Sequence, residues 1–485
     1  MRFFYDYYLV RNTFLIFALI VLPIPKANDK NYTLMHQFIE RNSIKKFPWS
    51  IFFIAIFIWL VLAGANFYYQ HFHDGYTGTG ILFPFSVIYP NAFLWSSFFF
   101  ATAFLVCGIF ALKFLDKMNV FVLTIVCFFL VVLGNLSQGS FSIGFMEPIY
   151  LKGRQYYNDA IAITNGDLWL KDFSKNIETF QLHTKTHPPF TTLLHYWILQ
   201  ASGGSIASVA IIFSVLGGLS FPLFYKSMLN LNIAKERAKQ LLLLFAVIPS
   251  VNIYLFVSID ALVLTSTLIF ILGITRFINR RKIDFLSVFY TVLGLFLTNM
   301  LSFSGLFLFA VLGLITLYFL FKRKYDFFIF SLICGVSFLI GLILLFVLTS
   351  YNHYEVFLLA SHSENPNGFR LLHQPLIYFF TRIENIAEIL LFLSFGFIAV
   401  LFSNKSKLTS DDLSVKILSV SGILALAVMF LTGAYGTGET ARACLYIVPF
   451  FVLLLKNITS ENFSILYVLC LFQTFGMQMI GNFFW

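Results

Sequence analysis

The residues best suited to chemistry lie in a polar stretch of a mostly apolar chain, the segment 153–169 (GRQYYNDAIAITNGDLW). Tyr156, Asp159 and Ile163 recur at the i, i+3 and i+7 spacing of one helical face, and Asn165-Gly166 is expected to end that helix. The Asp159 carboxylate would then lie on the apolar side of a short amphipathic helix, where partial desolvation raises its basicity. Such a group can take a proton from a hydroxyl, although a helix-surface Asp without any role fits the same spacing.

His187 is a second candidate, because it stands directly before two prolines in THPPFTTLLHYWILQ. Pro188 and Pro189 lack an N–H and are tolerated in the first turn of a helix, so they predict a helix start with His187 just outside it. They also weaken the backbone anion site of that helix. We expect them to fix the direction of His187 so that its side chain donates to a phosphate. A plain capping or loop histidine is the alternative.

Charged groups also lie where apolar segments end. Asp260 stands between two apolar runs, and an acidic group at a membrane boundary is either solvated or functional. Glu439 and Arg442 are three residues apart in loop C (433–443, GAYGTGETARA). On a helix they would be neighbours, and a structural ion pair is the simplest interpretation.

Loop B (351–383) is rich in His, Glu and Arg and contains Arg370 and Arg382. None of its spacings is diagnostic of a metal site, so no metal ligand is assigned. A divalent metal is the one cofactor that the pattern leaves open. All five cysteines fall in apolar segments without a CxxC motif, so neither zinc nor a disulfide framework is indicated.

The elements that position these groups must be membrane helices. Of 485 residues, 59% are hydrophobic and 11% charged, against roughly 25% charged in soluble domains. We expect an all-α polytopic membrane protein with short outer-face helices in its large loops. Apolar runs of about 20 residues predict spanning helices at about thirteen places: 49–69, 91–112, 119–134, 205–225, 240–257, 261–275, 285–300, 303–321, 327–349, 384–402, 413–432, 443–455 and 463–482.

Charge patterning predicts the sidedness of the chain. The net charge is +10, but Lys and Arg stand in short clusters between apolar runs, as the positive-inside rule expects, so nucleic acid is excluded as a partner. Loop A (135–189), loop B and loop C then lie on the outer side. This requires that the helix after His187 is re-entrant or interfacial, because about a dozen residues cannot span a bilayer.

We expect a multi-pass protein of a prokaryotic cell membrane, or of the endoplasmic reticulum if the chain is eukaryotic. The apolar run at 13–24 is short and follows Arg11. It fits a cleaved signal segment, an interfacial helix or a retained span, and a retained helix is favoured.

Taken in order, these features resemble the GT-C glycosyltransferases. The resemblance rests on an Asp in the first large outer loop, a His-Pro-Pro helix start, and Pro249, Ser250 and Tyr254 ahead of Asp260. It covers about 119–275 and loop C, and is nearest to protein O-mannosyltransferases and lipid A aminoarabinose transferases. The segment GETARACLYIVPF resembles one in prokaryotic members. The chain departs from the family in having Asn158-Asp159 in place of an acidic pair, and two extra spans before residue 119.

The resemblance implies a GT-C-like bundle that moves a sugar from a polyprenyl phosphate to a hydroxyl of a glycan, lipid or protein, on the outer face among membrane lipids. Asp159 would be the base. The donor phosphate would be bound by His187, Arg442, Arg370 and Arg382. The supporting residues would be Asp260, Glu439, Tyr156, Pro188 and Pro189.

The same reasoning divides the chain into an N-terminal segment with two extra spans (1–118), a catalytic membrane module (119–349) and a C-terminal bundle (350–485). Two other functions remain open. A secondary transporter or lipid flippase usually shows paired repeats and broken helices in corresponding halves, and we find no internal repeat. A non-catalytic subunit of an envelope-assembly complex would tolerate the loss of Asp159.

Overall fold

A computed structural model describes residues 47–72, 89–90, 94–152, 154–403, 412–436 and 438–483, which belong to one compact unit. This part of the chain is helical apart from a two-residue antiparallel pairing of β1 (Tyr89–Pro90) with β2 (Gly481–Asn482). The helix expected within residues 1–24 lies outside the described residues.

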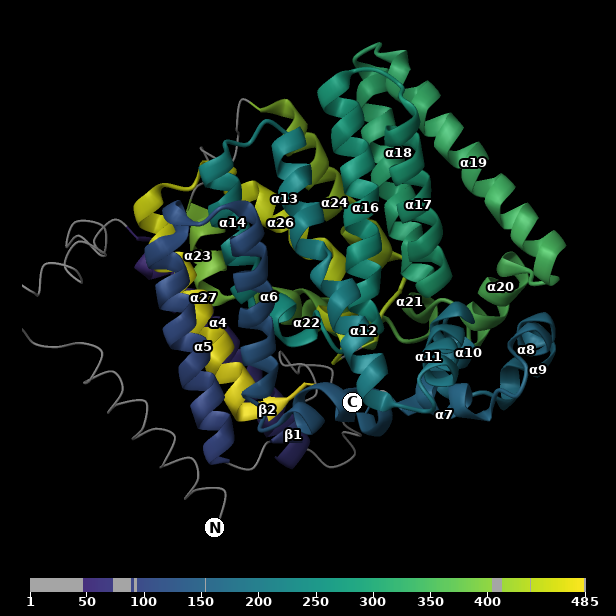
Figure 1. Cartoon of the computed structure of the whole chain (residues 1–485), viewed down its shortest axis with the longest axis horizontal. Coiled ribbons are helices and arrows are strands. Elements are labelled where there is room, and N and C mark those ends of the chain that lie inside the picture. The colour runs from purple at the N-terminus through teal and green to yellow at the C-terminus, as the bar shows by residue number, and fades with distance from the viewer. Residues whose placement is uncertain are drawn as a thin grey trace, which may run out of the picture. The chain divides into compact units, whose positions relative to one another are not determined.

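Long apolar helices form a bundle (Figure 1). Within the described residues, seven helices can cross a membrane by length and composition, or up to eight if one bent pair counts as a span. The all-α polytopic architecture is therefore confirmed, whereas thirteen spans remains a prediction. The helices of the bundle are α4 (Trp49–Phe72), α5 (Trp95–Phe114), α6 (Val120–Leu136), α12 (Ile206–Gly218), α13 (Ser220–Asn230), α14 (Lys235–Val247), α16 (Ile259–Arg280), α17 (Phe285–Leu301), α18 (Leu306–Phe321), α19 (Tyr325–Thr349), α22 (Pro375–Leu393), α23 (Phe395–Ser403), α24 (Leu413–Leu431), α26 (Val448–Leu453) and α27 (Ser460–Ile480).

Helix α16 runs through the middle of the bundle and is buried along most of its length, against α12, α13 and α17. The contact with α17 is so close that a Cβ on Gly294 would lie 2.4 Å from the backbone nitrogen of Phe270. Helix α19 lies at the edge of the bundle (Figure 1) and exposes most of its apolar side chains, as a helix in contact with lipid does. Because Asp260 belongs to the first turn of α16, the core itself determines where this carboxylate lies.

The range 240–257, predicted as one helix, is broken before Pro249. Helix α14 ends at Val247, Ile248 has a ψ of 131°, and the short α15 (Pro249–Tyr254) follows. Proline supplies no N–H to continue the helix. The freed carbonyls accept from side chains instead: Asn252 Nδ2 donates to Ala246 O (3.0 Å) and Thr474 Oγ1 donates to Val247 O (2.7 Å), as a break at membrane depth requires.

A second predicted helix, 384–402, is also bent. Helices α22 and α23 meet at an angle of 99°, at Ser394, whose φ is +98°. The side chain of Gln473 serves both backbone groups released by the bend: its Oε1 accepts from the N–H of Phe395 (3.0 Å) and its Nε2 donates to the carbonyl of Leu391 (2.7 Å). A side chain of α27 thus replaces the lost ladder bonds and stabilises the kink.

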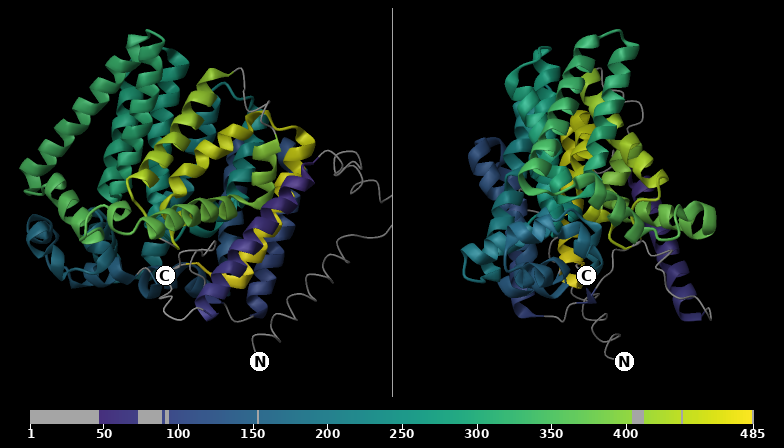
Figure 2. Two further views of the ribbon diagram at one scale, coloured as in Figure 1. Left: turned by 180° about the vertical axis from the view of Figure 1, so that it is seen from behind. Right: turned by 90° about the vertical axis from the view of Figure 1, so that its right-hand side faces the viewer.

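Short helices gather at one end of the bundle, where they line its lower edge in Figure 1 and, seen from behind, in Figure 2. Those of loop A and loop B share a small apolar core that includes Phe173, Leu193, Tyr351 and Val356. The short helices are α7 (Arg154–Ala162), α8 (Gly166–Lys171), α9 (Phe173–Asn176), α10 (Leu182–Thr186), α11 (Phe190–Ala201), α20 (His353–Glu364) and α21 (Arg370–His373).

Two turn predictions in loop A have different outcomes. Helix α11 begins at Phe190, directly after Pro188 and Pro189, so the predicted helix start is confirmed. Asn165-Gly166 was expected to stop a helix, but α7 has already ended at Ala162 and Asn165 starts α8. Its Oδ1 accepts from the N–H of Leu168 (3.0 Å), because Asn is as good an N-cap as it is a helix terminator.

The bend between α22 and α23 yields a stability prediction. Replacing Gln473 with Leu removes both bridging hydrogen bonds and leaves the Phe395 N–H without a partner, while the Leu391 carbonyl keeps only its bond from the Ser394 N–H. We expect a loss of about 1–3 kcal/mol in the free energy of unfolding, measured by denaturant titration in detergent. Ser464→Ala, at a partly exposed position on the same helix, is the control and should change stability by less than about 0.5 kcal/mol. Equal stabilities for the two variants would contradict the bridging role.

Candidate functional site

Arg442 is the centre of a charged cluster at the end of the bundle where the short helices gather. It belongs to a one-turn helix, α25 (Thr440–Ala443). One Nη2–H donates to the carboxylate of Glu439, and Nε lies 3.5 Å from Oδ2 of Asp260. The side chains of Arg442 and Asp260 are only 13% and 16% exposed.

The contact with Asp260 is an ion pair too long to be a charged hydrogen bond. The Nε of Arg442 is therefore buried without a hydrogen-bond acceptor among the described residues. Buried polar groups are nearly always satisfied, and an exception calls for an explanation. A guanidinium N–H in this state is a candidate contact for an anionic ligand.

Helix α22 holds loop C in place through polar side chains on one face. Arg382 donates from Nη1 to the carbonyl of Phe430 (3.0 Å) and from Nη2 to that of Tyr435 (2.6 Å). Its guanidinium also lies 5.4 Å from the centroid of the Tyr378 ring. Asn385 Nδ2, one turn further on, donates to the carbonyl of Gly436 (2.7 Å).

Glu388 completes this face. Its two carboxylate oxygens accept from the N–H groups of Thr440 (3.1 Å) and Ala441 (3.2 Å), at the start of α25. Both N–H groups belong to the first turn of a helix and have no partner within it. Glu388 therefore orients the one turn of helix that carries Arg442.

The geometry gives Arg382 a positioning role, although its Nε, like that of Arg442, is buried without an acceptor among the described residues. The sequence placed it among the groups that bind a donor phosphate, but both of its Nη atoms donate to backbone carbonyls of the 430–435 segment. A guanidinium held by several carbonyls stabilises the conformation of the chain around it. Arg382 positions loop C, and Arg442 is the residue of this loop that has a donor to offer.

Loop A reaches the cluster through Tyr156, which is buried in α7. Its ring stacks on those of His183 (centroids 5.7 Å apart) and His195 (5.9 Å), and it meets His187 edge to face (5.7 Å). Burial, and then the nearby charge of Asp260, raises the pKa of Tyr156 well above its ordinary value. Its hydroxyl therefore keeps its proton at neutral pH and remains a hydrogen-bond donor.

His187 does not have the hydrogen bonding that was expected of it. Its Nδ1 lies 3.1 Å from the carbonyl oxygen of His183 and 3.2 Å from Oγ1 of Thr186. A carbonyl oxygen can only accept, so Nδ1 carries the proton. In the neutral imidazole Nε2 is then an acceptor.

The charge state of His187 leads to the same conclusion. Burial, and next the neighbouring His183, lowers the pKa of His187 to about 3, while burial and Arg442 lower that of His183 to about 4. Both imidazoles are therefore neutral near pH 7. A neutral His187 with an acceptor at Nε2 can receive a hydrogen bond from a hydroxyl, but it cannot donate from that atom to a phosphate as the sequence suggested.

Asp159 is tied to loop A itself. It is partly exposed, and its Oδ2 accepts from the N–H of Gln181 (3.0 Å), just before α10. Among the described residues, the ion pairs of Arg442 go to Glu439 and Asp260 and none goes to Asp159. Asp159 thus holds α10, which carries His183 and ends beside His187. Within the part of the chain that the structure describes, no hydrogen bond or ion pair joins Asp159 to the charged cluster, so the geometry does not support Asp159 as the reacting base.

Two groups at this end come from loop B. Glu364, at the end of α20, forms a hydrogen bond with the side chain of Thr186 and lies within electrostatic range of Glu439 and Arg370. Arg370 begins α21. The structure therefore brings Arg370 close to a carboxylate of loop B, and Arg442 remains the cation at the centre of the cluster.

From the sequence alone, His183 and Glu364 of loop B received no role, and the polar face of α22 was missed. A usable signal for the latter was present in 381–389 (TRIENIAEI), where Arg382, Asn385 and Glu388 recur every three residues in an apolar run, the spacing of one helical face. No group of three or more His, Cys, Asp or Glu is arranged to hold a metal ion within the described ranges.

Comparison of the chain with protein families, with characterised proteins and with solved structures gave no match. The cluster itself indicates the chemistry of the site. It offers a buried cationic donor, Arg442, two carboxylates that accept protons, Asp260 and Glu439, and a neutral imidazole acceptor, His187. That set can hold an anion and remove a proton from a nearby hydroxyl.

The stacked histidines predict how stability depends on pH. Their folded-state pKa values, about 4 and about 3, are below the unfolded value of about 6.5. Below pH 6.5 the unfolded chain therefore binds more protons, and stability falls as the pH decreases towards 4. In the double variant His183→Gln/His187→Gln, the thermal midpoint should fall less over this window. His362→Gln, on the exposed side of α20, is the control. The same slope in all three proteins would contradict the burial of neutral imidazoles.

Proposed function

We propose that this chain is an integral-membrane glycosyltransferase of the GT-C type, with about thirteen spans, that moves a sugar from a polyprenyl phosphate to a hydroxyl acceptor at the outer face of a cell membrane. The observation that carries the proposal is the buried Nε of Arg442, which has no acceptor among the described residues and lies beside Asp260 where the loop helices meet the bundle. An anionic group attached to a membrane lipid would reach this point from the bilayer.

In this mechanism Arg442 binds the phosphate of the donor. A guanidinium pairs well with phosphate oxygens and keeps its charge at any physiological pH. Cleavage of the bond between the sugar and the phosphate leaves the electron pair on the phosphate oxygen, and the fixed charge of Arg442 stabilises that product. Glu439 already pairs with Arg442, so its negative charge competes with the donor phosphate for the same cation.

Asp260 is the base that the geometry favours. It lies beside Arg442, at the place where the leaving phosphate would be held. The acceptor hydroxyl gives its proton to the carboxylate while its oxygen forms the new bond to the anomeric carbon. The neutral His187 can accept a hydrogen bond from the same hydroxyl through Nε2, and Tyr156 can donate one. Asp159 acts on the position of α10 and does not take the proton.

A transporter or lipid flippase is the second candidate, because one observation favours it. Transporters use broken helices with polar groups at the break, and both the α14–α15 and the α22–α23 junctions are broken. The polar side chains of α22, however, hold loop C rather than facing an open site. A transporter would move a lipid-linked sugar without making a new glycosidic bond, so product analysis separates the two functions. No observation favours a non-catalytic assembly subunit.

The donor-binding role of Arg442 predicts opposite effects from two substitutions. Arg442→Gln should raise the KM for the polyprenyl-phosphate sugar by roughly ten- to a hundredfold, because a hydrogen bond to a charged group contributes about 1.5–3 kcal/mol. Glu439→Gln removes the competing charge and should lower that KM. Transfer rates are measured against donor concentration in nanodiscs. If the KM moves in the same direction in both variants, Arg442 does not bind the phosphate.

The assignment of the base predicts a contrast between two aspartates. Asp260→Asn should reduce kcat by roughly 10²–10⁴-fold, the usual contribution of a general base. Asp159→Asn keeps an oxygen that accepts from Gln181 and should retain activity within a few-fold. Both variants are first shown to be folded by thermal unfolding in detergent. The reverse order, with Asp159→Asn inactive and Asp260→Asn active, would return the role of base to Asp159.

A further inference from the structure

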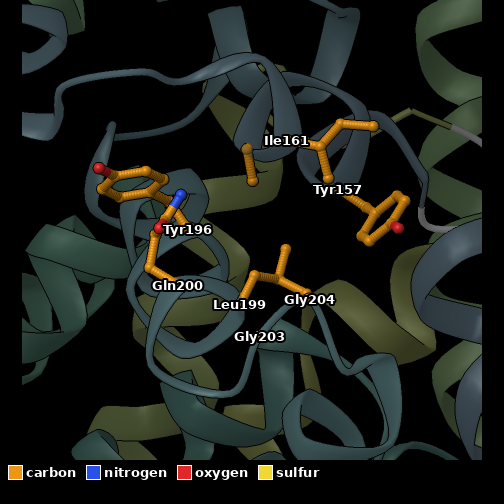
Figure 3. A pocket seen from close by; sticks show the side chains of 8 residues that line it. Tyr157, Ile161, Tyr196, Leu199, Gln200, Gly203 and Gly204 are labelled. Atoms are coloured by element: carbon orange, nitrogen blue, oxygen red, sulfur yellow. The ribbon is translucent and has the colours of Figure 1, made fainter.

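A pocket of about 300 Å³ opens between α7 and α11, beside the charged cluster (Figure 3). Tyr157 and Ile161 line it from α7, and Tyr196 and Gln200 line it from α11, with the two tyrosine rings on opposite sides. Its floor includes the buried Leu199. The volume is at the low end for small-molecule sites, so the pocket suits a ligand of one ring or part of a longer chain.

The pocket and the charged cluster share their two walls. On α7, Tyr156 faces the cluster and the next residue, Tyr157, lines the pocket; on α11, His195 stacks on Tyr156 and the next residue, Tyr196, lines the pocket. Successive helical residues point about 100° apart, since a turn takes 3.6 residues. Adjacent residues on each helix therefore face different sites. Tyr156 and His195 face the cluster, and Tyr157 and Tyr196 line the pocket.

The rim of the pocket is formed by two glycines in left-handed conformations. Gly203 (φ +66°) ends α11: its N–H donates to Gln200 O, and that of Gly204 donates to Leu199 O (2.8 Å). This pairing requires only the first glycine. Gly204 is also left-handed (φ +88°), and a Cβ on either residue would meet no atom within 4 Å. The second glycine keeps the rim open and exposes backbone to a ligand.

The lining determines the class of ligand. It contains no charged side chain, so it offers a phosphate or a carboxylate no counter-ion. A hydrocarbon chain would cover the two tyrosine hydroxyls and the Gln200 amide without replacing their hydrogen bonds to water, which is costly. A sugar ring matches the lining better: its C–H face packs on an aromatic ring, and its hydroxyls pair with tyrosine O–H, amide and backbone groups.

We propose that this pocket is a saccharide-binding site that takes an uncharged pyranose ring. The rings of Tyr157 and Tyr196 cover the faces of the sugar, the amide of Gln200 binds its hydroxyls, and Gly204 leaves space for its edge. The site is defined by binding alone. That it holds the glycan acceptor, delivered past the shared wall towards Asp260, rests on the transferase function proposed above.

The test measures binding of free methyl glycosides to the chain in nanodiscs, since detergents with sugar headgroups would compete. The probes are methyl α-glucopyranoside, methyl α-mannopyranoside and methyl α-galactopyranoside, followed by saturation-transfer NMR. At least one should bind in the millimolar range. Tyr196→Ala and Gln200→Ala should each weaken that binding about tenfold or more. Tyr325→Ala, an exposed tyrosine at the far end of α19, is the matched control and should bind like the unmodified chain.

Three results would overturn the proposal: no binding of any of the three glycosides, unchanged binding in Tyr196→Ala, or displacement of the bound glycoside by 1-octanol, which would show an apolar ligand. Arg442→Gln separates the pocket from the transfer site, because it should leave glycoside binding unchanged. Glycoside binding without any sugar transfer from polyprenyl phosphate would refute the proposed function but support the saccharide-binding site. Sugar transfer without glycoside binding would support the proposed function but refute the saccharide-binding site.

Discussion

The site depends above all on the polar face of α22. Loop C contains several glycines and would not hold one conformation by itself, and the four-residue α25 is too short to be stable alone. Arg382 and Asn385 bind the backbone before this helix, and Glu388 binds N–H groups in its first turn. Loop C is therefore held at two points. Its carbonyls accept from Arg382 and Asn385 at the first point, and its N–H groups donate to Glu388 at the second. Only with this clamp in place does Arg442 meet Asp260.

The other half of the pair is positioned by the core. Asp260 lies in the first turn of α16, and the chain reaches it through α15, whose Asn252 is fully buried. Asn252 receives a hydrogen bond from Gln478 of α27 (3.2 Å) at its Oδ1, and its carbonyl accepts from Asn135 of α6 (2.9 Å). A side chain on Gly134 would collide with this amide, with a Cβ 1.9 Å from Asn252 Oδ1. Oδ1 of Asn135 has no partner among the described residues, but the other hydrogen bonds tie α15 to α6 and α27 and so fix where α16 begins.

Apolar length and composition predicted most of the helices, because burial in lipid leaves few alternatives for a backbone. The breaks at Pro249 and Ser394 were missed, since what makes them stable is a side chain far along the sequence, such as Gln473. In the site, five predicted residues converge: Tyr156, His187, Asp260, Glu439 and Arg442. Arg382 and Asp159 were given reactive roles because residue type alone does not reveal which partners already occupy a side chain. Which nitrogen of His187 carries the proton is likewise visible only once the carbonyl of His183 is placed beside it.

Photocrosslinking tests the central claim most directly, the claim that the phosphate of a membrane lipid is held at Arg442. The probe is a polyprenyl phosphate with a diazirine on the isoprene unit next to the phosphate, incubated with the chain in nanodiscs and mapped by mass spectrometry. The account predicts adducts in peptides that contain residues 438–450 or 156–187, and their loss when the probe is the corresponding polyprenol without phosphate. Adducts confined to the lipid-exposed face of α19, or equal labelling by the phosphate-free probe, would contradict it.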